Sequence, residues 1–135
     1  AILSGRPPDW WCGAWVADCG RGLNPELGAW RASVGVAPVL IVHADLPLLR
    51  AGEIAELLAV AAAQGIALAT DRAGEGSNAL AIADGRAFDF RFGPGSRKHH
   101  AGQAPGLAVL DLPGLVADID TPEDLAFARA RGFPG

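Results

Sequence analysis

The sequence feature that most constrains the fold is the apolar run Val36–Val42, which has no polar residue among its seven positions. Such a run, without polar alternation, is typical of a strand buried on both faces, as in a parallel sheet. A helical pattern follows at 51–64 and ends at Gly65, and a second apolar stretch occupies 66–69. Strand, helix and strand in this order predict a βαβ unit and an α/β fold.

Further short elements are expected on both sides of this unit. A first helix should run to about residue 33, with Asn24 as its N-cap and Pro25 in its first position. A last helix should begin after Thr121, where Asp124 completes a capping box. The remaining expected elements are strands at 79–83, 107–110 and 115–117, a half-exposed strand at 88–92, and a short polar helix at 97–102.

Composition and charge exclude several classes of protein. Half of the 135 residues are hydrophobic and 19% are charged, which supports one packed domain over residues 1–135. The net charge is −4 without a Lys/Arg cluster, so we expect no nucleic-acid partner. No apolar run reaches the roughly 20 residues of a membrane helix, and no signal peptide is recognisable. We therefore expect no membrane partner and a cytoplasmic location, with Cys12 and Cys19 as free thiols.

Polar features follow several of the predicted strands. Asp45 comes after the run that ends at residue 42, and Asp118 directly follows the triplet 115–117. The loops 71–78 and 93–96 each combine glycines, which let N–H groups turn toward an anion, with a serine hydroxyl. Each feature alone is also typical of a plain turn or a helix N-terminus. In an open α/β sheet, however, ligands bind beyond the carboxyl ends of the strands, so all four should share one edge.

Two carboxylates beside an anion pocket need a cation between them. Mg²⁺ suits this position, because it accepts carboxylate and phosphate oxygens together. The pattern therefore predicts phosphate chemistry assisted by Mg²⁺. The histidines are expected outside this chemistry, with His43 in a structural role and His99 and His100 on a solvated helix face.

Five stretches occur in an order that resembles one enzyme family. They are Gly22–Asn24, Ala44–Leu49, Asp71–Leu80, Phe92–Ser96 and Asp118–Leu125. Together they resemble the 2-phospho-L-lactate and phosphoenolpyruvate guanylyltransferases of coenzyme F-420 biosynthesis, over about residues 16–130. The resemblance implies a Rossmann-like, GT-A-like nucleotidyltransferase fold of three layers with a mixed, mostly parallel sheet. It also implies GTP as the donor of GMP and a small phosphorylated carboxylic acid as the acceptor, with release of pyrophosphate.

The resemblance further implies roles for single residues. Asp45 and Asp118 match the catalytic pair that holds Mg²⁺. Asp120 directly precedes the predicted cap Thr121, so its charge suits the helix N-terminus and we expect only a supporting role for it. The positions that match the acceptor site are Ser77, Asn78, Gly93 and Ser96. Arg72 is expected to be a further contact to the anion. The positions that match a loop near the nucleotide are Gly22, Leu23 and Asn24.

The beginning of the sequence departs from the family pattern. The chain contains no Met and starts at Ala1, and nothing matches the family's first strand or its basic loop that grips the triphosphate. We therefore expect an N-terminally truncated domain that associates with itself and has no turnover alone; a homodimer is compatible with this. Two alternatives stay open. One is another nucleotidyltransferase of the same fold, with a sugar-phosphate, polyol-phosphate or molybdopterin acceptor, and the other is an inactive domain that binds an anion.

Overall fold

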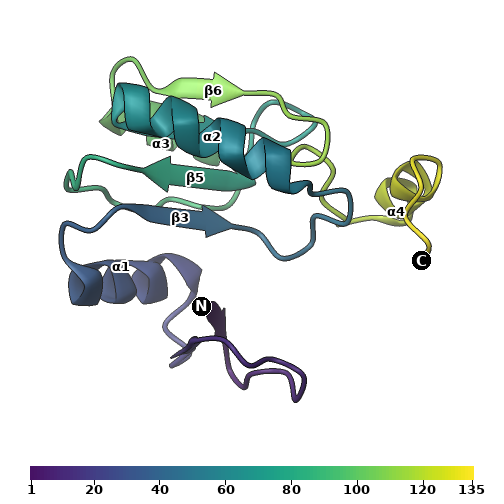
Figure 1. Ribbon diagram of the computed structural model, residues 1–135, viewed down its shortest axis with the longest axis horizontal. Coiled ribbons are helices and arrows are strands. Elements are labelled where there is room, and N and C mark those ends of the chain that lie inside the picture. Colours follow the sequence, from purple (N-terminus) through teal and green to yellow (C-terminus); the bar gives the residue numbers. More distant parts are fainter.

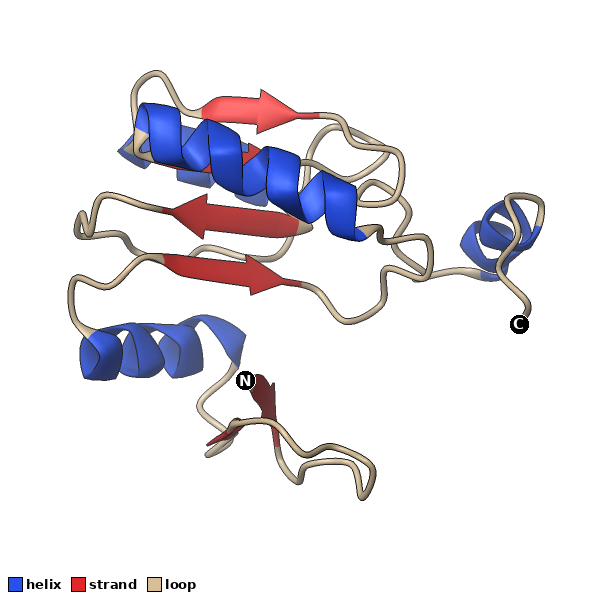
Figure 2. Cartoon of the chain, viewed as in Figure 1, coloured by secondary structure: helices blue, strands red, loops and turns tan.

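A computed structural model describes all 135 residues, and it contains six strands and four helices (Figures 1 and 2). The strands are β1 (Ile2–Ser4), β2 (Trp15–Ala17), β3 (Val39–Val42), β4 (Ile66–Ala69), β5 (Ala79–Ile82) and β6 (Ala108–Leu110). The helices are α1 (Leu23–Val34), α2 (Ala51–Gln64), α3 (Ser96–Gln103) and α4 (Pro122–Arg129). None of the helices is long and apolar enough to cross a membrane.

Four strands form the central sheet, in the order β3-β5-β4-β6. The β4–β6 ladder is parallel, whereas β5 runs antiparallel to both of its neighbours. The strands β3 and β4 are thus parallel to each other, as the βαβ pattern predicts, but β5 lies between them. This mixed sheet confirms the α/β expectation, and the narrower GT-A-like assignment stays a prediction.

The sheet lies between two layers of different packing (Figure 1). On the α2 face, the strands β4 and β5 present only alanines, such as Ala67 and Ala81, and α2 packs there through Leu57 and Ala61. On the other face they present Ile66, Leu68, Leu80 and Ile82, which pack against Phe90 and Phe92 together with α1 residues. Small side chains let α2 approach the sheet closely, and large ones fill the wider gap between the sheet and the irregular segment 88–92.

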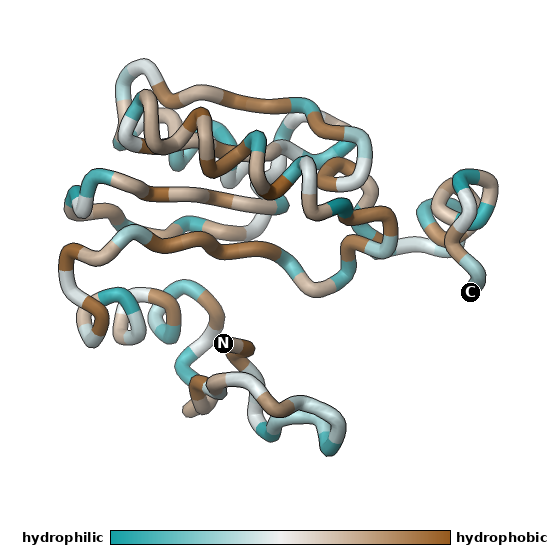
Figure 3. The backbone as a smooth tube through the Cα atoms, in the orientation of Figure 1, coloured by the Kyte–Doolittle hydropathy of each residue, from teal (hydrophilic) through white to brown (hydrophobic).

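The strand β3 lies at the edge of the sheet, and this corrects one expectation. Figure 3 shows a continuous hydrophobic stretch along β3, but only Val39 is buried, and the next three residues are half-buried. Val36, at the start of the predicted run, is 80% exposed. Burial on both faces requires a neighbour on each side, whereas β3 pairs with β5 alone.

Two predicted strands, at 88–92 and 115–117, do not form. Residues 86–92 alternate between inward and outward side chains, as predicted, but side chains replace the strand ladder. The Asn24 amide accepts from the Phe92 N–H at 2.8 Å and donates to its carbonyl at 3.0 Å. Gln103 makes the same pair of bonds to Asp89. Residues 113–115 form a turn instead of a strand, closed by the Leu115 N–H on the Leu112 carbonyl.

The helix boundaries follow local capping signals closely, with one exception. The prediction of α2 and its terminal Gly65 is confirmed, as is the Thr121–Asp124 capping box of α4. Helix α1 begins before the predicted N-cap, Asn24, because the buried Glu26 carboxylate accepts the N–H groups of Cys19 and Arg21 and holds the preceding loop. The Arg21 guanidinium lowers the pKa of Glu26 to about 2.

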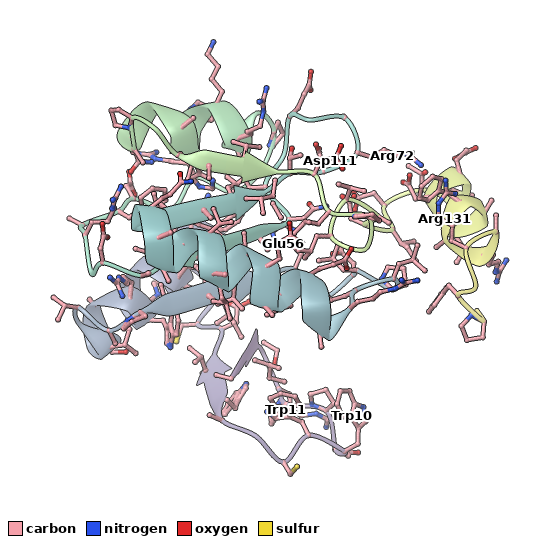
Figure 4. The ribbon with its side chains drawn as sticks, turned by 45° about the horizontal axis from the view of Figure 1, so that its top comes forward. Trp10, Trp11, Glu56, Arg72, Asp111 and Arg131 are labelled. Carbon is pink, nitrogen blue, oxygen red and sulfur yellow. The ribbon has the colours of Figure 1, made fainter.

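The N-terminal region forms a small separate unit beside α1. The strands β1 and β2 pair only with each other, in parallel. Trp10 and Trp11 lie edge to face with their ring centroids 6.1 Å apart, and Trp10 is 78% exposed, so it is no part of the core (Figure 4). Cys12 and Cys19 are free and exposed.

Candidate functional site

The predicted site residues gather at one edge of the central sheet. The register places Ala79, at the start of β5, opposite Val42 of β3 and Ala69 of β4, and Ala69 lies opposite Leu110 of β6. The ends of β3, β4 and β6 therefore meet the beginning of β5 along one row, which the loops around Asp45, 71–78 and 112–118 border. This is the edge at which open α/β sheets bind ligands.

The two predicted metal carboxylates come from segments that touch each other. The Ile119 N–H donates to the Asp45 carbonyl at 3.1 Å, so Asp118 is next to a residue bonded to Asp45. Asp45 is exposed and Asp118 is half-buried, and neither carboxylate takes part in a hydrogen bond or an ion pair within the chain. No three His, Cys, Asp or Glu side chains are grouped as a complete metal cage.

Two unpaired carboxylates on adjoining segments are compatible with a Mg²⁺ site. Magnesium keeps several water molecules and is held through one or two carboxylates plus substrate phosphates, so a full protein cage is not required. Two carboxylates without a counter-ion, on adjoining segments, meet that requirement. Zinc would need three or four protein ligands, which the chain does not supply here.

Asn78 holds the two carboxylate-bearing segments together. Its side chain is buried, and its Nδ2 donates to the Leu115 carbonyl at 3.0 Å. Its main-chain carbonyl accepts from the His43 N–H at 3.0 Å. The residue thus links the segment before Asp45 to the turn before Asp118. One N–H of its amide is bonded there, which gives the residue a bracing role, and the second N–H has no partner within the chain and stays available to the acceptor that the sequence predicts.

Ser77 and His100 form a buried pair beside Asn78. Ser77 is 2% exposed, and its Oγ lies 3.0 Å from Nδ1 of His100, which is fully buried. The Arg91 N–H donates to the other ring nitrogen, Nε2, at 3.0 Å. Burial lowers the pKa of His100 to about 4, with a smaller contribution from the charge of His99. The expectation that His100 lies on a solvated helix face is therefore wrong, whereas His99 is exposed as predicted.

The glycine loop at 93–96 leads into α3 and adjoins the loop at 71–78. The Arg97 N–H donates to the Glu75 carbonyl at 3.0 Å, which brings the two predicted acceptor loops together. Gly93 and Gly95 have φ of 119° and 69°, in the region that favours glycine. The N–H groups of Ser96 to His99 bond within the chain, but those of Gly93 and Gly95 do not. Ser96 is buried at the first position of α3.

Arg72 faces α4 instead of lying free at the site (Figure 4). Its Nη2 lies 2.6 Å from Oδ1 of Asp124, and its guanidinium lies 4.8 Å from the Phe127 ring centroid. Arg131 covers the same ring at 3.5 Å. The Thr121 hydrogen bond, with help from Arg72, lowers the pKa of Asp124. This contact uses only Nη2 of the guanidinium, and no hydrogen bond within the chain involves its other N–H groups.

The three predicted nucleotide residues have different surroundings. Leu23 and Asp45 line a common open cleft of about 640 Å³, whose walls come mostly from α1, β1 and the free edge of β3. Gly22 is the N-cap of α1, and both polar groups of the Asn24 amide bond the Phe92 backbone. The structure therefore places Leu23 in the wall of the same cleft as Asp45, but it uses Asn24 to hold the segment before Gly93.

Sequence reasoning missed His100 as a member of the site. The residue stands four positions after Ser96, so it lies one helical turn further along the same face of α3. The preceding alternation of Phe88, Phe90 and Phe92 marks the apolar side on which that helix packs. These two signals together could have indicated a buried histidine.

Comparisons with known proteins identify the family of the chain. The model of a family described as "Guanylyl transferase CofC like" matches residues 14–129. The chain belongs to this CofC-like guanylyltransferase family. The match nearly coincides with the stretch over which the sequence motifs resemble the family, about 16–130, and it includes every predicted site residue.

Several curated relatives carry the same name, phosphoenolpyruvate guanylyltransferase. The chain is 41% identical over 123 residues to the protein from Nocardia farcinica, covering 87% of the chain and 54% of the relative. It is 44% identical over 120 residues to the protein from Thermomonospora curvata, covering 85% and 52%. For Sphaerobacter thermophilus the identity is 43% over 113 residues, covering 78% and 55%. The chain thus spans about half the length of the curated relatives it matches.

Proposed function

We propose that this chain carries the acceptor and metal side of a guanylyltransferase that moves GMP from GTP to phosphoenolpyruvate. The observation that carries the proposal is the hydrogen bond from the Ile119 N–H to the Asp45 carbonyl, which joins the two segments that carry Asp45 and Asp118. Both carboxylates are unpaired within the chain, and they lie beside the Ser77 and glycine loops. The names of the relatives supply the substrate. In this reaction an acceptor phosphate oxygen bonds to the α-phosphorus of GTP while the bond to the β-phosphate oxygen breaks, and pyrophosphate leaves.

Charge neutralisation and positioning are sufficient chemistry for such a transfer. The attacking phosphate is already an anion, so no general base is needed. Asp45 and Asp118 would hold Mg²⁺, which supplies positive charge to the phosphate oxygens when bound. Asp120, directly before the α4 cap, supports them. The cleft that Leu23 and Asp45 line is the proposed nucleotide side, because one of the two carboxylates, Asp45, lies in its wall.

The acceptor is proposed to bind at the Ser77 and Gly93–Ser96 loops. The Gly93 and Gly95 N–H groups have no acceptor within the chain, and a carboxylate or phosphate needs such donors. The hydroxyls of Ser77 and Ser96 lie in the same pair of joined loops. Phosphoenolpyruvate and 2-phospho-L-lactate present the same two anionic groups, so both are acceptor candidates, and either product belongs to coenzyme F-420 biosynthesis.

The test is release of pyrophosphate from GTP with Mg²⁺ and each acceptor, using the Nocardia farcinica relative as the positive control. GTP is compared with ATP, CTP and UTP, and phosphoenolpyruvate with 2-phospho-L-lactate, a sugar phosphate and a polyol phosphate. Titration calorimetry of the chain with phosphoenolpyruvate and Mg²⁺ measures acceptor binding separately from turnover. A chain that binds neither acceptor, or that prefers a sugar or polyol phosphate, contradicts the proposal.

A cytoplasmic location is part of the same proposal. Two exposed free thiols, Cys12 and Cys19, fit a reducing compartment, in which small phosphorylated acids and GTP are also available. A homodimer stays a prediction, which sedimentation of the purified chain would test.

A further inference from the structure

The buried pair of Ser77 and His100 contains a hydrogen-bonding detail that the sequence did not indicate. The two residues are 23 positions apart, and Oγ of Ser77 lies 3.0 Å from Nδ1 of His100. On the far side of the ring, Nε2 lies 3.0 Å from the main-chain nitrogen of Arg91. Each ring nitrogen therefore has one defined partner, and both side chains are buried, with Ser77 2% exposed.

The Arg91 contact decides where the imidazole proton lies. A main-chain N–H can only donate, so Nε2 must be the acceptor and carries no proton. The single proton of the neutral ring is then on Nδ1, and Nδ1–H donates to the Ser77 oxygen. Because Ser77 accepts this bond, its own hydroxyl proton is free, and no acceptor for that proton lies within the chain.

The surroundings keep the ring neutral and in place. The Phe92 ring centroid lies 4.9 Å from that of His100 in an edge-on contact, and the Phe88 centroid lies 5.4 Å away. A second proton on the ring would be on Nε2, where its N–H would face the Arg91 N–H inside an apolar layer. Two donors would then face each other without an acceptor. The pKa of His100, lowered to about 4 by burial, agrees with a neutral ring at physiological pH.

We propose that His100 is a positioning residue of the acceptor site, which holds the Ser77 hydroxyl as a donor to an anionic oxygen of the phosphorylated acid. The inference rests on the proposed function for the identity of that acid. The new element is that His100, on the inner side of α3 and out of contact with the acid, sets the direction of the hydrogen bond from Ser77 to the acid. A buried donor without a partner is uncommon in folded proteins, and an incoming oxygen would satisfy it.

Two substitutions separate the roles of the two ring nitrogens. His100→Asn keeps a donor near the position of Nδ1, so it retains the bond to Ser77 and loses the acceptor for Arg91. His100→Gln keeps an acceptor near the position of Nε2 and loses the donor to Ser77. We expect His100→Gln to weaken phosphoenolpyruvate binding about 10- to 100-fold, the loss typical of a hydrogen bond to a charged group. His100→Asn should weaken it much less, and GTP binding should change in neither variant.

The double variant Ser77→Ala/His100→Gln tests whether His100 acts through Ser77. If it does, His100→Gln adds no further loss of phosphoenolpyruvate affinity once Ser77 is Ala. Equal losses in the Asn and Gln variants, or additive losses in the double variant, would show a purely structural role and overturn the proposal. Circular dichroism and urea unfolding identify any variant that does not fold.

Nitrogen NMR of the unmodified chain gives a readout that needs no variant and no substrate. Long-range ¹H–¹⁵N spectra distinguish the two neutral tautomers and the charged ring. We expect the Nδ1–H tautomer of His100 near neutral pH, and an Nε2–H tautomer or a charged ring overturns the inference. Failure of the wild-type chain to bind either acceptor instead contradicts the proposed function, so the two failures are distinguishable.

Discussion

The carboxylate half and the hydroxyl half of the candidate site differ in how their polar groups are paired. Asp45 is exposed and Asp118 is half-buried, and neither has a hydrogen bond or counter-ion, although the backbones of their segments are joined. Ser77 and His100 are buried, and every ring nitrogen of the histidine has a partner. The carboxylate half carries negative charge that a ligand must neutralise. In the hydroxyl half, the side chains of Ser77 and His100 are already held by hydrogen bonds when the chain folds. Substitutions in the two halves should therefore separate activity from stability.

The largest effect is expected from removal of a carboxylate charge. In a form of the protein that turns over, Asp45→Asn or Asp118→Asn should lower turnover about 100-fold or more, because neutralisation by the bound metal contributes several kcal/mol to such transfers. The free energy of unfolding should change little, since neither carboxylate has a partner to lose. Pyrophosphate release against Mg²⁺ concentration, together with urea unfolding, measures both. Normal turnover in Asp118→Asn with loss in Asp120→Asn would assign the metal to the other carboxylate.

The pH dependence of stability tests the hydroxyl half. An unfolded histidine takes up a proton below its ordinary pKa of 6.5, but folded His100 does so only near 4. Between these values the unfolded state binds more protons, so stability falls with falling pH and levels off below about 4. Urea unfolding at several pH values should show this slope in the wild type but not in His100→Asn. Parallel curves for the two proteins would place His100 in contact with solvent.

Asn78 joins the two halves, and its loss should lower stability moderately. In Asn78→Ala the buried Leu115 carbonyl loses its donor, which costs roughly 1–3 kcal/mol of unfolding free energy. Asn24→Ala is a matched control, because it also removes an amide bonded to backbone, at Phe92, but from a half-exposed position. Urea denaturation of both variants gives the comparison. A larger loss in Asn24→Ala would show that Asn78 is not the main link.

Arg72 should show the smallest effect on stability. It is about half exposed and pairs with Asp124 across the loop and α4, a kind of ion pair that adds little to stability. Arg72→Ala should therefore change the thermal midpoint very little. Weaker binding of phosphoenolpyruvate with unchanged binding of GTP, measured by titration calorimetry, would show that Arg72 turns to the acceptor, as the sequence predicts. Unchanged values for both would restrict Arg72 to its contact with Asp124.

The sequence alone determined the features that depend on near neighbours in the chain. The apolar spacing of 51–64 with its final Gly65, the short apolar stretches that form β4 and β5, and the Thr121–Asp124 cap were all predicted correctly. The reason is that helix caps and side-chain periodicity involve residues within about four positions of each other. The same signals placed Asp45 and the Ser77 loop at one edge, because both adjoin ends of strands.

Only the tertiary structure decided which groups are paired across long separations. The position of β5 between β3 and β4 left β3 at the edge, so its apolar run is half-buried. The N–H groups of Asp89, Arg91 and Phe92 bond to side chains of distant helices, and no strand formed there. His100 became buried through the same contacts. A hydrogen bond between residues that are far apart in the chain leaves no periodic pattern, because each partner alone is compatible with an exposed position.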